Sequence, residues 1–250
     1  MRVATDLALA LDAATWAETA TGFELDGWQA DILRSGAGRV LLNCCRQSGK
    51  STIAALATLH LAQYRPNTLA LMLSPSLRQS QELFKKLIGA YHRLDSPVPT
   101  EAESALRLEL ENGSRVISLP GRESTVRGYS GVDLLVIDEA ARVADDLYYA
   151  VRPMLAVSGG RLLALSTPFG TRGWWHTEYT DGGPAWLRAE VTAEECPRIS
   201  DEFLAEERQH LGEWWYSQEY ECKFQDAQTS AFTWAMLEAA TAEEVVSWEL

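Results

Sequence analysis

Short, uninterrupted apolar runs alternate along the chain with longer stretches of helical character. The runs have the length and composition of buried strands, and they cover residues 39–44, 68–73, 133–137 and 161–165. Apolar strands that alternate with helices form a mostly parallel sheet with helices on both faces. The pattern therefore predicts an α/β fold of this kind.

The helices are placed by their composition and by the residues that end them. They are predicted over residues 6–20, 28–34, 51–64, 77–92 and 145–155. A hairpin is predicted over residues 106–119, because Asn112 and Gly113 supply the positive φ angles of a tight turn. After Thr192 the chain is again predicted to be helical, over residues 201–210, 213–221 and 232–240.

Composition and charge narrow the class of protein. The 250 residues are 46% hydrophobic, as in soluble globular domains, and the apolar runs are too short to span a membrane. The four cysteines lack the spacing of a disulfide framework or a zinc site, so we expect a reduced, cytoplasmic protein. The net charge is −13, and the acidic residues concentrate at the two ends, in residues 1–31 and 194–226. This charge argues against a partner that needs many phosphate contacts.

The sharpest chemical signal lies between the first predicted strand and the helix after it. A phosphate-binding loop needs small residues whose backbone N–H groups wrap the phosphates, a lysine for the outer phosphates and a hydroxyl for Mg²⁺. Gly49, Lys50 and Ser51 fit these places, although Cys44 stands where the usual motif has its first glycine. We therefore predict that this loop binds ATP and Mg²⁺. The candidate contacts are Arg46, Gln47, Ser48, Gly49, Lys50, Ser51 and Thr52.

Polar residues also end the last two predicted strands. Asp138 would lie at the carboxyl edge of the sheet, where it can hold Mg²⁺, and Glu139 can polarise a water for attack on the γ-phosphate. Ser166 and Thr167 would lie beside the same phosphate and could report its loss. We expect a further strand to lie between the strand before the phosphate-binding loop, residues 39–44, and the strand before Asp138, residues 133–137. This arrangement favours a RecA-like ATPase over a kinase or GTPase.

Trp28 and Gln29 form a candidate adenine site upstream of the loop. The Gln29 amide can donate and accept at once, which matches the edge of adenine. Trp28 can stack on the base, or it can be a buried side chain that anchors its helix. Both interpretations of Trp28 stay open at this point.

Taken in order, these motifs resemble the ATPase domain of viral DNA-packaging terminase large subunits. The resemblance covers residues 22–230 and rests on Trp28-Gln29, residues 45–51, Ser74-Pro75-Ser76, Gln79-Ser80, Arg127-Gly128, residues 137–140, Ser166-Thr167-Pro168 and residues 215–224. It implies a RecA-like fold with a small lid, in a motor that threads double-stranded DNA into a bacteriophage procapsid. It also implies a homo-oligomeric ring in the host cytoplasm, with the portal protein and the small terminase subunit as partners.

The resemblance also implies a role for each motif residue. Lys50 and Ser51 would bind phosphate and Mg²⁺, Asp138 would bind Mg²⁺, and Glu139 would activate water. Ser166 and Thr167 would couple hydrolysis to movement of the lid, and Gln29 would bind adenine. Arg46 falls where the family carries an arginine in this loop, and a guanidinium there can bind the γ-phosphate.

An arginine from a neighbouring subunit is expected in such a ring. Its candidates are Arg107, Arg115, Arg122 and Arg127. Arg127 could instead act within its own subunit. We expect DNA contact to be weak and transient, with residues 123–129 as one candidate region.

The predicted division is an ATPase core over residues 1–195, a helical lid or linker over 196–230, and a tail over 231–250. The tail holds no cluster of aspartates like that of the family's nuclease, so we expect no DNA cleavage by this chain. Two alternatives for its function are a fragment of a superfamily 2 helicase and an ATP-binding module that orders a ring with little turnover.

Overall fold

One mixed β-sheet organises the molecule. The computed structural model describes residues 2–22, 24–94, 97–121, 126, 128–226 and 240. Within them the strand order is β3-β4-β5-β2-β6-β7-β1-β8, and the six strands from β5 to β8 run parallel. The strands are β1 (Arg39–Cys44), β2 (Leu69–Ser74), β3 (Thr100–Ser104), β4 (Arg107–Leu110), β5 (Arg115–Pro120), β6 (Leu134–Asp138), β7 (Arg161–Ser166) and β8 (Leu187–Val191). The predicted fold class is confirmed, and β7 does lie between β1 and β6.

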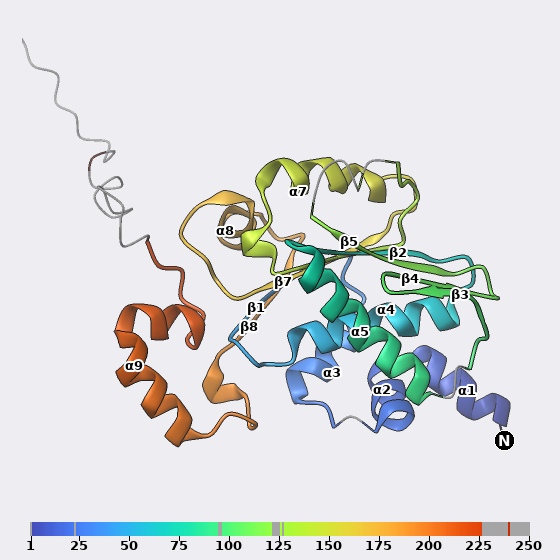
Figure 1. The fold of residues 1–250 in the computed structure, drawn as a ribbon, viewed down its shortest axis with the longest axis horizontal. Coiled ribbons are helices and arrows are strands. Elements are labelled where there is room, and N and C mark those ends of the chain that lie inside the picture. The colour runs from blue at the N-terminus through green and yellow to red at the C-terminus, as the bar shows by residue number, and fades with distance from the viewer. Residues whose placement is uncertain are drawn as a thin grey trace, which may run out of the picture.

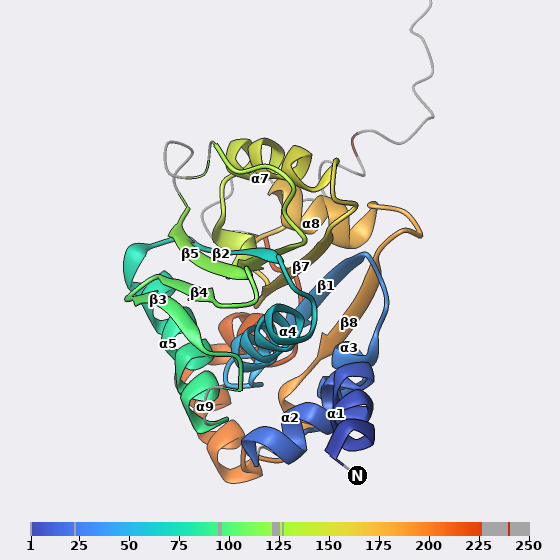
Figure 2. The same cartoon turned by 90° about the vertical axis from the view of Figure 1, so that its right-hand side faces the viewer.

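Helices cover both faces of this sheet (Figures 1 and 2). One face carries α2 (Ala13–Thr21), α3 (Gly27–Arg34), α4 (Lys50–Tyr64) and α5 (Leu77–Arg93). The other face carries α7 (Asp145–Val151) and α8 (Gly173–Thr180). The remaining helices are α1 (Arg2–Leu11), α9 (Asp201–Glu219), and the short 3₁₀ helices η1 (Ala140–Arg142), η2 (Arg152–Leu155) and η3 (Ala193–Glu195). No helix in the described ranges is both long and apolar enough to cross a membrane.

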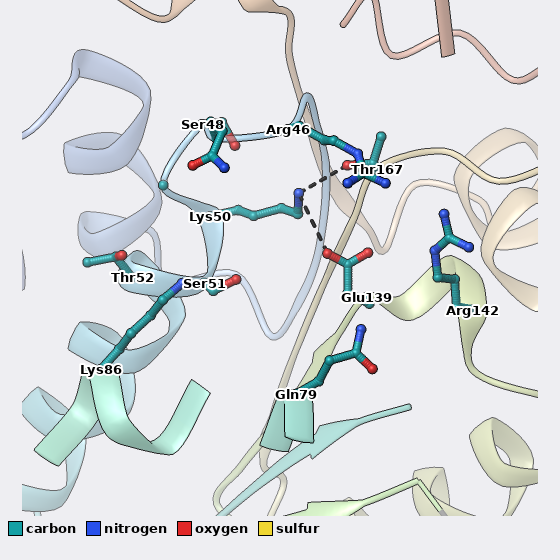
Figure 3. Close-up of a pocket in the computed structure, with 12 residues that line it drawn as sticks. Arg46, Ser48, Lys50, Ser51, Thr52, Gln79, Lys86, Glu139, Arg142 and Thr167 are labelled. Carbon is teal, nitrogen blue, oxygen red and sulfur yellow. Dashed lines mark hydrogen bonds and ion pairs between the residues drawn. The ribbon is translucent and has the colours of Figure 1, made fainter. Parts of the chain in front are cut away.

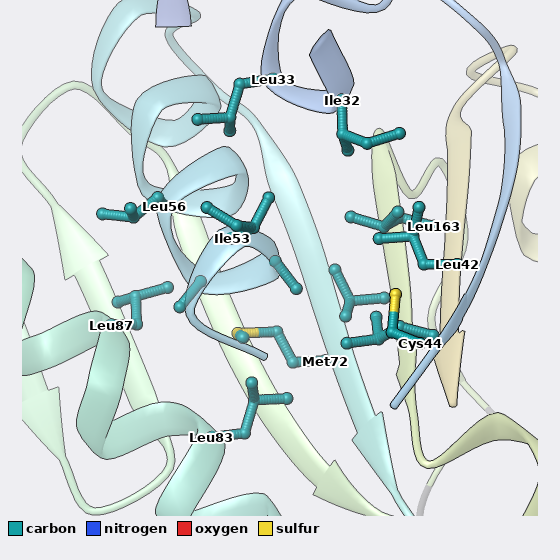
Figure 4. Packing of buried hydrophobic residues seen from close by; sticks show 14 of the residues in the cluster. Ile32, Leu33, Leu42, Cys44, Ile53, Leu56, Met72, Leu83, Leu87 and Leu163 are labelled. Atoms are coloured by element: carbon teal, nitrogen blue, oxygen red, sulfur yellow. The ribbon is translucent and has the colours of Figure 1, made fainter. Parts of the chain in front are cut away.

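The central strands are apolar throughout because each contributes to two cores. On β1, Leu42 belongs to the cluster under α4 and α5, whereas Leu41 belongs to the cluster under α7 and α8. Figure 4 shows the first cluster, where Leu42 and Leu163 of the sheet pack with Ile53 of α4. Side chains of a strand alternate between faces, so a sheet covered twice needs apolar residues at every position.

Some helices and edge strands differ from the predictions. The helix predicted over 6–20 is two helices, because Asp12 adopts an extended conformation and accepts hydrogen bonds from the N–H groups of Ala14 and Thr15 as the cap of α2. The edge strands β3 and β8 and the helix α8 were not predicted. β3 is mostly exposed and β8 is mixed in exposure, and the two buried residues of α8 are adjacent, so none of the three shows a clear apolar period. The break predicted between residues 210 and 213 is confirmed as a kink at Gly212 in α9, with φ 72°. The predicted helix over 232–240 lies outside the described residues, apart from residue 240.

Candidate active site

The loop between β1 and α4 has the backbone of an anion-binding turn. Gln47 and Gly49 have positive φ angles of 62° and 90°, and Gly49 caps the start of α4. A Cβ on Gly49 would lie 2.8 Å from Nε2 of Gln29, so both backbone and space require glycine there. Cys44 is still part of β1 and lacks a positive φ. The missing first glycine of the usual motif therefore does not impair this loop.

A cavity of about 520 Å³ opens where the loop meets the carboxyl ends of the strands (Figure 3). Its lining includes the predicted loop residues 46–52, Glu139 and Thr167. The buried Asp138 and Ser166 lie behind them at the ends of β6 and β7. Three lining residues were not predicted as site residues, and they are Gln79, Lys86 and Arg142. Of these, Gln79 was named only as part of a family motif.

Lys50 is a buried cation with weak partners. The residue is 7% exposed, and its Nζ donates to Thr167 Oγ1 at 3.0 Å and to the carbonyl of Cys45 at 3.4 Å. Its ion pair with Glu139 Oε1 is long, at 4.0 Å. A buried ammonium gains most from a strong anionic acceptor, so this arrangement suits a phosphate in the cavity.

Ser51 and Asp138 form a site that fits Mg²⁺. Ser51 Oγ donates to Asp138 Oδ1 at 3.2 Å and lies 3.3 Å from Oδ2. Burial, reinforced by the charge of Glu139, raises the pKa of Asp138 to about 6. A divalent cation would offset both effects. Mg²⁺ usually takes one or two protein oxygens together with substrate phosphates and water, and Ser51 and Asp138 can supply such oxygens.

Glu139 is held in an unusual backbone conformation directly after β6. Its φ and ψ are 51° and 44°, in the left-handed region that few residues other than glycine adopt. The turn is fixed to β7, because the N–H of Ala141 donates to Ser166 Oγ at 3.1 Å and that hydroxyl donates to the carbonyl of Thr167 at 2.8 Å. Backbone strain of this kind is concentrated at functional sites. The turn directs Glu139 toward Lys50 (Figure 3).

Arg46 joins the loop to the last turn of α9. Its Nε donates to Glu219 Oε2, and its backbone N–H donates to the carbonyl of Glu219 at 3.1 Å. Arg46 would have to leave this carboxylate to reach the γ-phosphate as predicted. Glu219 was not singled out in the sequence, because nothing local connects it with a loop so far away along the chain.

The structure does not bring Gln29 into the cavity as an adenine contact. Gln29 is completely buried, its Oε1 accepts from the N–H of Asp26 at 3.0 Å, and its Nε2 donates to the carbonyl of Ser48 at 3.2 Å. One end of the amide therefore supports the loop, and the other caps the start of α3. Trp28 packs against the core and is not part of the cavity lining, which agrees with the interpretation of Trp28 as an anchor.

Arg198, from the segment before α9, completes this support and was missed in the sequence. Its guanidinium binds both carboxylate oxygens of Asp26 at 2.8 and 2.7 Å. The same group donates to the carbonyl of Ser48 at 2.9 Å. Two separate segments thus hold one carbonyl of the phosphate loop.

The candidate arginines for a neighbouring subunit lie elsewhere. Arg115 begins β5 at the amino edge of the parallel strands, opposite the cavity. Arg107 pairs with Glu109 on β4. Arg122 and Arg127, with most of the predicted DNA-contact region, lie outside the described residues. The role of each in a neighbouring site stays a prediction.

Comparisons with known proteins agree on one family, the terminase large subunits. A family model described as "Terminase large subunit, T4likevirus-type, N-terminal" matches residues 41–239. The terminase large subunits of Thermus phage G20c and Thermus virus P23-45 are 29% and 30% identical over 181 residues. Each match covers 63% of this chain and 37% of the relative, so the chain spans well under half the length of these relatives.

Solved structures show the same fold. The large terminase ATPase domain of Thermus phage P74-26 superposes with a TM-score of 0.74 at 22% identity, over 83% of this chain and 97% of that one. The large terminase of bacteriophage D6E in complex with ADP gives a TM-score of 0.67 at 11% identity, over 80% of this chain and 54% of that one.

Proposed function

Because the chain belongs to the family of T4likevirus-type terminase large subunits, whose N-terminal region it matches, we propose that it is an ATP-hydrolysing motor domain that drives double-stranded DNA into a procapsid. The observation that carries the proposal is the convergence of Lys50, Thr167 and Glu139 on one cavity at the start of α4. The similar large terminase of bacteriophage D6E has been solved with ADP and with ATP-γ-S, which supports a nucleotide in this cavity. Family membership does not favour the alternatives of a helicase fragment or a module with little turnover.

The residues of the cavity divide the reaction between them. Lys50 would exchange its neutral acceptors for the outer phosphates, where its charge is used more fully. Ser51 and Asp138 would hold Mg²⁺, which neutralises phosphate charge when it is bound with ATP. Glu139 would orient the attacking water and accept its proton at the carboxylate.

Two sets of contacts would transmit a conformational change from the cavity to the rest of the domain when ATP is hydrolysed. The pair of Arg46 and Glu219 links the loop to α9, in the region of residues 196–230 that we propose as the lid. Ser166 links β7 to the turn after Glu139. We propose that these contacts change with the nucleotide and move the lid relative to the core, residues 1–195.

The partners follow from the proposed role. We propose a ring on the portal protein of a procapsid in the host cytoplasm, with the small terminase subunit as a further partner. The DNA contact would be weak and transient, because a net charge of −13 leaves little capacity to neutralise phosphates. ATP hydrolysis that rises more steeply than linearly with protein concentration would support sites completed by neighbouring subunits.

Glu139→Gln tests the proposed chemistry. The amide keeps the shape of the side chain but cannot accept a proton, so kcat should fall about 100-fold or more while ATP still binds. Glu111→Gln, on the exposed turn after β4, is the matched control and should keep the wild-type rate. Steady-state phosphate release and displacement of a fluorescent ATP analogue measure the two quantities. An unchanged rate in Glu139→Gln would remove the role assigned to Glu139.

A further inference from the structure

Arg142 brings a guanidinium to the mouth of the cavity. It is the last residue of η1, three positions after Glu139, and its side chain lines the cavity. Figure 3 shows Glu139 between Lys50 on one side and Arg142 on the other. In the part of the chain that the structure describes, the side chain of Arg142 makes no hydrogen bond or ion pair.

The backbone that carries this guanidinium is fixed, and an aromatic ring lies against the side chain. Its Cζ lies 4.1 Å from the ring centroid of Phe169, a half-exposed aromatic just beyond Thr167. The residues on either side of Arg142 are also fixed, because the Ala141 N–H donates to Ser166 and the carbonyl of Val143 accepts from Nε1 of Trp174 at 3.0 Å. The fixed backbone therefore places this side chain at the cavity, and the ring contact is the interaction that a ligand would alter.

Arg142 and Arg46, the arginine of the phosphate loop, differ in what each must release before it can bind a phosphate. Arg46 is already bound to Glu219, so any contact with a phosphate competes with that ion pair. Among the residues that the structure describes, Arg142 is held by the face of one ring, an interaction of about 0.5–1 kcal/mol at an exposed site. A phosphate would therefore displace little when it binds Arg142.

We infer that Arg142 is a further catalytic residue, which binds the γ-phosphate of ATP within its own subunit and stabilises the charge that develops in the transition state. The inference rests on the proposed ATPase function. In the reaction the bond between the γ-phosphorus and the β,γ-bridging oxygen breaks, and a bond from the water oxygen to phosphorus forms. The proton of the water passes to Glu139. Arg142 stays protonated throughout and contributes two parallel hydrogen bonds to phosphate oxygens.

Arg142→Ala and Arg142→Lys test this role in the full chain, with Arg93→Ala as the control. Arg93 is an exposed arginine at the end of α5 and does not line the cavity. Loss of a transition-state donor should lower kcat about 100-fold in Arg142→Ala. Arg142→Lys should recover only a small part of that rate, because an ammonium cannot bind two oxygens in parallel. Arg93→Ala should behave as the wild type.

Binding measurements separate catalysis from folding. In Arg142→Ala the affinity for ADP with aluminium fluoride should fall, whereas the affinity for ADP alone and the melting temperature should not change. A mixture of Arg142→Ala with Glu139→Gln should stay inactive if both residues act on the same bound ATP. Restored activity in the mixture would overturn the assignment to one subunit, and a kcat within about twofold of wild type in Arg142→Ala would overturn the catalytic role itself. A wild-type chain that hydrolyses no ATP would instead refute the proposed function.

Discussion

The ion pair between Arg46 and Glu219 opposes any contact of Arg46 with a phosphate, and Glu219→Gln tests this competition. The side chain of Glu219 is 8% exposed and that of Arg46 is 59% exposed, so solvent screens the pair only in part. When Arg46 leaves, a carboxylate stays buried without its partner, which costs about 1–2 kcal/mol. A glutamine needs no counter-charge. The affinity for ATP should therefore rise about 5- to 30-fold in the variant.

Displacement of a fluorescent ATP analogue in the presence of Mg²⁺ measures this change. ADP lacks the γ-phosphate that Arg46 would reach, so its affinity should change by less than about twofold. Glu202→Gln, in the exposed first turn of α9, removes the same charge from a residue that has no ion pair with any part of the chain that the structure describes, and it should affect neither nucleotide. Weaker ATP binding in Glu219→Gln, or equal gains for ATP and ADP, would refute the competition.

Three further substitutions test the electrostatics, the core and the loop support. Burial raises the pKa of Asp138 from 3.8 to about 6, so the stability it contributes is fully present below pH 3.8 and is lost as the pH rises through 6. In scanning fluorimetry of metal-free protein, Asp138→Asn should therefore raise the melting temperature at pH 8, and an equal increase near pH 3.8 would contradict the shift. Trp174→Ala should lower the free energy of unfolding in urea by about 3–5 kcal/mol, because Trp174 is buried and stacks on Tyr148 at 3.8 Å; a loss below about 1 kcal/mol would contradict this packing. Arg198→Ala releases the carbonyl of Ser48 and should weaken ATP and ADP alike, by about fivefold in the displacement assay, whereas a selective loss of ATP would place Arg198 at the γ-phosphate.

How much of the site could be predicted depends on whether its residues are local in sequence. The phosphate loop and Asp138-Glu139 each lie at the end of a strand, so the chain around them already shows where they lie. Arg198 and Glu219 reach the loop only through tertiary packing. Glu219 lies within the family motif 215–224, but that motif does not show which of its residues contacts the loop. The partner of Gln29 could not be predicted from the sequence either. Its amide can bind adenine or backbone equally well, and in the structure it is buried and binds backbone, so its role toward adenine stays a prediction.

In the fold, the central strands could be predicted from the sequence, whereas the edge strands could not. Central strands such as β1 and β6 are buried on both faces, which gives continuous apolar runs that the sequence displays clearly. The edge strand β8 is half-exposed and mixed in polarity, so it shows no such run. Asp12 interrupts a stretch of good helix formers, and whether an aspartate continues or caps a helix depends on packing around it.

Strand β1 is synthesised long before either of its neighbours in the sheet. Arg39 pairs with Leu162 of β7, and Val40 pairs with Leu187 of β8. Until those segments leave the ribosome, both edges of an apolar strand have no native partner, and such edges readily pair with other chains. Pairings so distant in sequence also fold slowly. The phosphate loop is therefore among the last parts of the chain to take shape during synthesis, and nucleotide can stabilise only a nearly complete domain.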